Sequence, residues 1–114
     1  MISVYQIVLT NEQVNDVNNP NTPTPDFYER YLNTTLSPTQ EAVKSALDAG
    51  DYEKVADVST DDLETSFMMM NRWSEVDEKC VNRIKPLHSM SVGDIVIDNK
   101  GKRSFVAGCG FEEV

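Results

Sequence analysis

Residues 94–107, DIVIDNKGKRSFVA, predict a β-hairpin in the last third of the sequence. Apolar residues stand on both sides of NKGK, and Gly101 supplies the positive φ that a tight hairpin loop requires. In the first strand, Ile95 and Ile97 should face one side of the sheet and Val96 the other. Because the two strands of a hairpin run antiparallel, this segment predicts an antiparallel sheet.

The segment before the hairpin, HSMSVGD (residues 88–94), combines the single histidine of the chain with two serines, a glycine and an aspartate. Gly93 permits a tight turn or a bulge, and Asp94 can satisfy backbone amides there. The hydroxyls of Ser89 and Ser91 can bond to neighbouring backbone groups. We therefore expect this segment to be a structural turn that leads into the hairpin.

Upstream of this turn, capping residues and apolar runs indicate further helices and strands. Ser37 can cap one helix, and Gly50 can end it. Ser59 with Asp62 three residues later resembles a capping box for a second helix, and Thr60 is an alternative cap. The expected strands cover residues 2–10, 52–58, 94–98 and 103–107, and the expected helices cover 37–49 and 60–73, with another beginning near residue 26.

These elements predict one α+β domain over residues 1–114. Its small antiparallel sheet should combine the N-terminal strand, the middle strand and the C-terminal hairpin, with two to three helices packed against it. The N-terminal strand carries apolar residues on both alternating sets, which is typical of a strand covered on both faces. Residues 11–25 are rich in Asn and Pro and are expected to form a surface loop.

The chain is strongly acidic, and its charge is unevenly distributed. Ten basic and 19 acidic residues give a formal net charge of −9. Residues 1–78 contain 4 basic and 15 acidic residues, whereas residues 79–114 contain 6 basic and 4 acidic residues. A field of this sign repels phosphate backbones, so direct binding of nucleic acid is not expected. The charge indicates a solvated surface that aids solubility, and a nucleic-acid decoy is the alternative.

Composition and the first residues indicate a cytoplasmic protein. No apolar run approaches the roughly 20 residues that a membrane span requires, so no membrane association is expected. The segment MISVYQIVLT lacks a basic region and a cleavage site of small residues, and it is expected to be a strand and not a signal peptide. Cys80 and Cys109 are then expected to be reduced thiols.

The expected 60–73 helix contains three consecutive methionines, Met68, Met69 and Met70. Thioether side chains can adapt to varied partners, but consecutive helical residues point about 100° apart. At most one or two of the three should therefore lie on the buried face. Met68, Met69 and Trp73 are the candidate partner contacts of this helix. Its expected apolar stripe comprises Leu63, Phe67, Met70 and Trp73.

Cys80, His88 and Cys109 are the residues that best suit a metal site or a nucleophile. Their intervals of 8 and 21 residues differ from the paired spacing of zinc ligands, so neither a metal nor a cofactor is expected. A hydrolytic module would use a cysteine as the nucleophile, His88 as the base and Asp94 to orient that base. Because no catalytic signature surrounds either cysteine, we expect a protein that is not an enzyme.

The order of motifs in the second half of the chain resembles a family of small proteins of unknown function. Its members are encoded by phages, plasmids and their bacterial hosts. They carry a VA-x-V strand, a DDLE-x-x-F helix, an S-x-S-V-G-D turn and a terminal G-F pair. The matching residues are Val55, Ala56, Val58, Asp61, Asp62, Leu63, Glu64, Phe67, Asn71, Ser89, Ser91, Val92, Gly93, Asp94, Gly110 and Phe111. The resemblance implies an accessory protein of a mobile element, without an assigned reaction.

The sequence as a whole predicts a small, acidic, non-enzymatic protein that binds a host protein, in the host cytoplasm if the gene is phage-encoded. The candidate binding residues are Met68, Met69, Trp73, His88, Ser89, Ser91 and Asp94. Two alternatives remain open. One is a small-ligand or hydrolytic module around Ser89–Asp94 and Cys109, and the other is an acidic decoy for nucleic acid.

Overall fold

The computed structural model describes residues 1–21, 23–36, 38–71, 80–85, 87–108 and 110–114, and these form an α+β fold. In chain order the elements are β1 (Ile2–Ile7), α1 (Asn11–Asn18), α2 (Asp26–Leu36), α3 (Gln40–Asp48), β2 (Tyr52–Val58), α4 (Leu63–Asn71), β3 (Val81–Arg83), β4 (Ile95–Ile97), β5 (Arg103–Val106) and β6 (Phe111–Glu113). The predicted class, an antiparallel sheet packed by helices, is confirmed.

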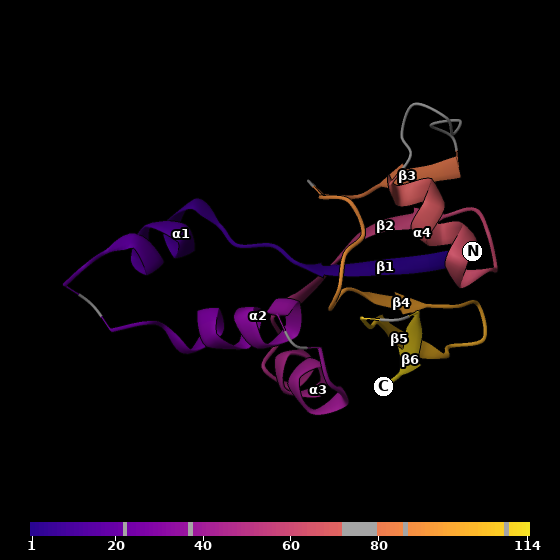
Figure 1. Cartoon of the computed structure of the whole chain (residues 1–114). Helices are drawn as coiled ribbons and strands as arrows, with labels where there is room; N and C mark the ends of the chain where they lie inside the picture. Colours follow the sequence, from indigo (N-terminus) through magenta and orange to yellow (C-terminus); the bar gives the residue numbers. More distant parts are fainter. Residues whose placement is uncertain (22, 37, 72–79, 86, 109) are drawn as a thin grey trace.

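The strands of the described residues form one sheet in the order β3-β2-β1-β4-β5-β6, and all neighbours are antiparallel (Figure 1). β1 lies in the middle, where Val4 is paired with Ala56 of β2 on one side and Val96 of β4 on the other. The three predicted parts of the sheet thus supply its four inner strands. The sequence does not predict the edge strands β3 and β6, because three residues are too few to show a period of two.

Both faces of the sheet are covered, and each face has its own helix. Val4 and Val96 belong to a core cluster that also contains Met70 of α4. Ile95 points to the opposite face, where it belongs to a second cluster with Val43 of α3. The predicted opposite orientation of neighbouring residues in β4 is therefore confirmed, as is the two-sided burial of the N-terminal strand.

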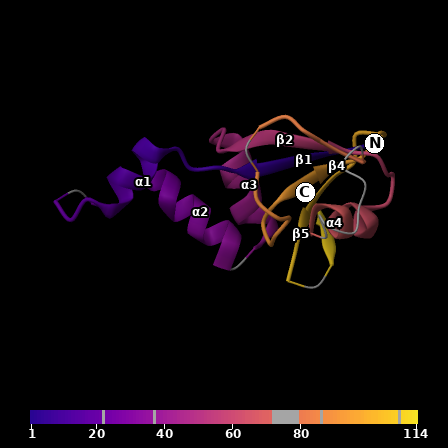
Figure 2. The same ribbon diagram turned by 90° about the horizontal axis from the view of Figure 1, so that it is seen from above.

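The helices α1 and α2 extend beyond one end of the sheet, away from α4 (Figures 1 and 2). The molecule accordingly measures 45 × 27 × 21 Å along its principal axes. α2 is held near the sheet by Arg30, whose Nε and Nη2 donate to the two carboxylate oxygens of Asp51 at 2.5 and 3.0 Å. This two-pronged ion pair joins α2 to the residue that immediately precedes β2.

The prediction of a surface loop over residues 11–25 is wrong for residues 11–18, which form helix α1. Thr10 Oγ1 accepts the backbone N–H of Gln13, and the Gln13 side chain accepts the backbone N–H of Thr10. This capping box satisfies two amides at the point where the chain enters the helix. No residue of α1 is buried, so the segment does lie at the surface.

The helix expected over residues 37–49 begins at Gln40 and is capped by Thr39, whose Oγ1 accepts the amide of Ala42 at 3.1 Å. The predicted cap, Ser37, lies outside the described residues. Gly50 follows the helix with a φ of +77°, as expected for a residue that ends a helix.

The cap of α4 is Asp62, and the predictions of Ser59 and Thr60 for this role are wrong. Asp62 Oδ2 accepts the backbone N–H of Thr65 at 3.0 Å, which is the contact that an N-cap residue makes. Ser59 continues the pairing of β2 instead, because its backbone N–H donates at 2.8 Å to the carbonyl oxygen of Cys80, and Thr60 Oγ1 accepts the backbone N–H of Asp62 at 3.2 Å.

The buried face of α4 is also rotated relative to the predicted stripe. Met70 is buried and Leu63 packs against the core, but Phe67 is 37% exposed, so its predicted burial is wrong. Ser66 takes the inward position instead, and its Oγ donates to the carbonyl oxygen of Leu63 at 2.6 Å. That local bond removes the penalty for burying a hydroxyl. Trp73 lies outside the described residues.

The predicted hairpin is present as β4 and β5. Gly101 has a φ of +82°, which confirms the conformation expected in the loop. Asp98 Oδ1 accepts the backbone N–H groups of Lys100 and Lys102, both at 2.9 Å. The loop is therefore closed by a carboxylate as well as by its glycine.

Candidate functional site

The segment over residues 87–94 is fastened to the sheet by the fully buried side chain of Gln6 on β1. Gln6 Nε2 donates to the carbonyl oxygen of His88 at 2.9 Å, and Gln6 Oε1 accepts the backbone N–H of His88 at 3.2 Å. The same Nε2 donates to Asp94 Oδ2 at 2.9 Å. One side-chain amide thus pairs with both ends of the segment, much as a neighbouring strand would.

Asp94 organises the turn between these two ends. It is only 5% exposed, and its Oδ2 also accepts the backbone N–H of Ser91 at 2.9 Å. The predicted role of Asp94 in satisfying turn amides is therefore confirmed. Burial raises the pKa of Asp94 to about 6, although the Ser91 amide, the charge of His88 and the Gln6 amide act in the opposite direction.

Gly93 is fixed in the turn by its backbone conformation and by close neighbours. Its φ is +91°, and a Cβ atom at this position would lie 2.5 Å from the carbonyl oxygen of Thr34 in α2. The Tyr52 hydroxyl donates to the carbonyl oxygen of Gly93 at 2.5 Å. Burial, aided by the Asp94 carboxylate, raises the pKa of Tyr52 and keeps the hydroxyl protonated. We call Gln6, Tyr52, Gly93 and Asp94 the polar hub.

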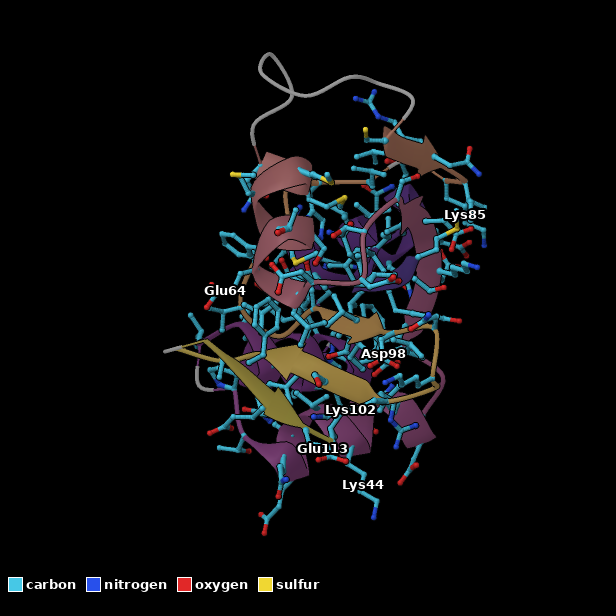
Figure 3. All side chains as sticks on the ribbon, turned by 90° about the vertical axis from the view of Figure 1, so that its right-hand side faces the viewer. Lys44, Glu64, Lys85, Asp98, Lys102 and Glu113 are labelled. Carbon is cyan, nitrogen blue, oxygen red and sulfur yellow. The ribbon has the colours of Figure 1, made fainter. Side chains whose placement is uncertain are left out.

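A groove lies beside the same segment, between α4 and the β5–β6 hairpin. Its volume of about 530 Å³ falls within the range of ligand pockets. The residues that line it include the apolar side chains Phe67, Met90, Val92, Val106 and Phe111, together with Glu64 and Ser91. We call it the α4–hairpin groove. It is predominantly apolar, and the carboxylate at its edge is labelled in Figure 3.

A second cavity of about 420 Å³, the α4 hollow, adjoins the groove because the two share Glu64 and Phe67. It is also lined by Asp62, Thr65, Met68 and Asn71. Thr65 donates to the Asp62 carboxylate from both its hydroxyl and its backbone N–H, and these bonds lower the pKa of Asp62. The hollow is therefore acidic at neutral pH.

The candidate residues from the sequence occupy different environments. Met68 is 43% exposed and lines the α4 hollow, whereas Met69 is partly buried and packs against the core. Ser91 lines the groove and is exposed, as are His88 and Ser89. Ser91 and Met68 thus border two cavities that meet at α4. Trp73 and Cys109 lie outside the described residues.

The predicted hydrolytic module requires the Asp94 carboxylate to contact the His88 imidazole, and no such contact is among the described ones. In the described contacts the two residues are linked through Gln6 and the His88 backbone, while the imidazole Nδ1 lies 2.8 Å from the carbonyl oxygen of Ser89. Neither residue lines the α4–hairpin groove. Within the described part of the chain, no three His, Cys, Asp or Glu side chains are grouped closely enough to hold a metal ion.

Sequence reasoning missed Gln6, Phe67 and Phe111 as residues of the site. Gln6 could have been found, because it is a lone amide in a strand of otherwise mostly apolar residues and such a group requires partners when buried. The helical spacing of Phe67 predicts a core residue, and the structure exposes it instead. Phe111 reaches the groove only through the tertiary arrangement of β6 and α4, for which the sequence carries no local signal.

Comparison with known proteins found no matching family model, no matching curated protein and no matching solved structure. Among the described residues, no helix combines the length and apolar character that are needed to cross a membrane. The resemblance to the phage and plasmid family, with the origin that it implies, stays a prediction.

Proposed function

We propose that this chain is a non-enzymatic binding protein that holds a segment of a partner protein in the α4–hairpin groove. The observation that carries the proposal is the exposure of two large apolar side chains at this groove and the adjoining hollow. Phe67 is 37% and Met68 is 43% exposed on consecutive positions of α4. Apolar side chains gathered at a concave surface are typical of sites that bind other molecules.

The polar hub supports a binding role over a hydrolytic one. Asp94 Oδ2 already accepts two N–H groups, from Gln6 and from Ser91, and the carboxylate is nearly inaccessible to solvent. The hydrolytic alternative needs Asp94 to orient the His88 imidazole, but the imidazole Nδ1 lies 2.8 Å from the carbonyl oxygen of Ser89. The hub instead fixes residues 90–92, which form part of the groove wall.

The resemblance to phage and plasmid proteins supports the further proposal that the partner is a bacterial host protein and that binding takes place in the host cytoplasm. The acidic surface, with a net charge of −9, would then keep the protein soluble at high concentration. A decoy for nucleic acid remains the second candidate, and it would bind a basic protein through a row of carboxylates rather than through the groove.

The test is a quantitative comparison of proteins captured from bacterial lysate by three forms of the full chain. The wild type is compared with a Phe67→Ala/Met68→Ala variant and with a Leu36→Ala variant. Leu36 is the matched control, because it is an apolar residue that is 78% exposed on α2, outside the groove. We expect the double variant to lose the partner and the control to retain it. Equal capture by all three forms would contradict the proposal.

A further inference from the structure

The polar groups in the α4 hollow that lack hydrogen-bond partners among the described residues are acceptors. The Glu64 carboxylate makes no ion pair or hydrogen bond with any of the described residues. Asn71 Oδ1 is buried without a donor, while its Nδ2 donates to the carbonyl oxygen of Met90 at 3.0 Å. Asp62 differs, because Thr65 already occupies its Oδ2. The acceptor that a ligand can reach is the exposed Glu64 carboxylate, so a ligand that complements the hollow should supply a cationic N–H donor.

The charged residues that line the hollow and the groove in the described part of the chain are all acidic. Glu64 and Asp62 are carboxylates, and no described residue that lines either cavity is a lysine or an arginine. In Figure 3, Glu64 lies between α4 and the β5–β6 hairpin, whereas the labelled lysines Lys44, Lys85 and Lys102 lie on other parts of the surface. Within the described residues, no basic side chain therefore lines the place where Phe67 and Met68 are exposed.

We propose that the bound partner segment is basic and apolar, with a lysine or arginine in the α4 hollow and a neighbouring apolar side chain in the α4–hairpin groove. The cation pairs with Glu64, while the apolar side chain contacts Phe67 and Phe111. This inference rests on the proposed function and adds the chemistry of the partner. The cavities share Phe67, so adjacent side chains of one segment can occupy both.

The two contacts contribute to binding in different ways. Apolar contact with the groove should supply most of the affinity, because exposed ion pairs contribute only a few tenths to about 1 kcal/mol. The carboxylates should supply selectivity, because an acidic segment would place like charges together. Removing the charge of Glu64 should therefore weaken binding by about threefold, and reversing it by about tenfold.

Three synthetic nonapeptides test this chemistry on the full chain. The first places two leucines beside two lysines among serines, the second replaces the lysines by glutamates, and the third replaces the leucines by serines. Binding is followed by NMR through the methyl groups of Met68 in the hollow and Met90 in the groove, with Val43 on the far face as reference. Each titration is repeated with Glu64→Lys and with Glu41→Lys.

Glu41 is a matched control for Glu64, because each is an acidic residue in the first turn of an exposed helix end. We expect the leucine–lysine peptide to shift both methionine methyls, the peptide without leucines to shift neither, and the leucine–glutamate peptide to bind at least about tenfold more weakly. Binding of the leucine–lysine peptide should be about tenfold weaker in Glu64→Lys and unchanged in Glu41→Lys. Equal or stronger binding of the leucine–glutamate peptide at the same methyls would overturn the basic partner and leave the groove as a binding site. Absence of any groove shift would also overturn the inference, and the lysate comparison would then decide on the proposed function separately.

Discussion

The polar hub and the α4–hairpin groove both contact the segment of residues 87–94, but they differ in which side chains they bury and which they expose. In the hub, Gln6, Asp94 and Tyr52 bury polar groups and pair them. At the groove and the adjoining α4 hollow, Phe67 and Met68 leave apolar groups partly in water. Buried, fully paired polar groups specify a structure, whereas exposed apolar groups contribute little to folding. The contrast assigns stability to the hub and binding to the groove.

The largest expected effect is that of Gly93→Ala in the hub. The new Cβ would meet the carbonyl oxygen of Thr34 at 2.5 Å in a backbone with a φ of +91°. We expect the free energy of unfolding to fall by more than about 3 kcal/mol. Gly101→Ala is the control, because Gly101 has a φ of +82° but open space around it, and it should cost about 1 kcal/mol. Equal losses in urea denaturation would show that the contact with α2 is unimportant.

The next effect is that of Gln6→Leu, which keeps the apolar volume but removes both partners of the His88 backbone and one donor to Asp94. We expect a loss of about 2–3 kcal/mol, because buried polar groups are left without partners. Gln40→Leu is the matched control. Gln40 is exposed and donates a single bond to the carbonyl oxygen of Glu113, so its loss should cost less than about 1 kcal/mol. Thermal denaturation of both variants measures the difference.

Asp94 should make the stability of the hub depend on pH. Burial raises the pKa of Asp94 to about 6, whereas in the unfolded chain it is about 4. Between pH 4 and pH 6 the carboxyl group is therefore protonated in the folded protein and ionised in the unfolded chain. The contribution of Asp94 is therefore greatest at low pH and is lost as the pH rises through 6. Between pH 5 and pH 7 the loss is about 1.4 kcal/mol.

Asp94→Asn removes this proton uptake, and comparison with the wild type isolates it from other carboxylates. Asp62 contributes in the opposite sense, because its lowered pKa gives stability that is lost as the pH falls. We expect the difference in unfolding free energy between Asp94→Asn and the wild type to change by about 1.4 kcal/mol between pH 5 and pH 7. A constant difference would mean that Asp94 has an ordinary pKa.

The smallest expected effect on stability is that of the Phe67→Ala/Met68→Ala variant, at the groove and the α4 hollow. Each residue is already about two-fifths exposed, and alanine favours the helix, so we expect a loss of about 1–2 kcal/mol, below that of Gln6→Leu. Thermal denaturation is the measurement. A loss comparable to that of Gln6→Leu would indicate that these side chains belong to the core, and the contrast between hub and groove would then disappear.

The parts of the fold that the sequence predicts are those with local signals. The hairpin follows from the alternation of Ile95, Val96 and Ile97 and from the loop glycine, and the turn role of Asp94 follows from its position after Gly93. Helix α1 also had a local signal, the Thr10–Gln13 capping box, but the Asn and Pro content of the segment obscured it. Cap choice depends on where the helix begins, which the sequence leaves uncertain by several residues.

The candidate site could be predicted only in part, because its components are distant in the sequence. Met68 and Ser91 were identified by their chemistry, but their relation to one another depends on how α4 lies against the β5–β6 hairpin. The buried position of Ser66 rotates α4 and brings Phe67 to the surface, which helical spacing alone does not reveal. The groove forms through tertiary packing, and the hydrophobic periodicity of a sequence predicts helices and strands but not how they pack together.

The most direct test of the central claim is a photo-crosslinking experiment with p-benzoylphenylalanine placed at Phe67 or, as the control, at Leu36. Both positions are exposed and apolar, but only Phe67 lies in the α4–hairpin groove. We predict that the partner captured by the wild type crosslinks to position 67 and not to position 36. Crosslinking of that partner to position 36 with none at position 67 would contradict the assignment of binding to the groove.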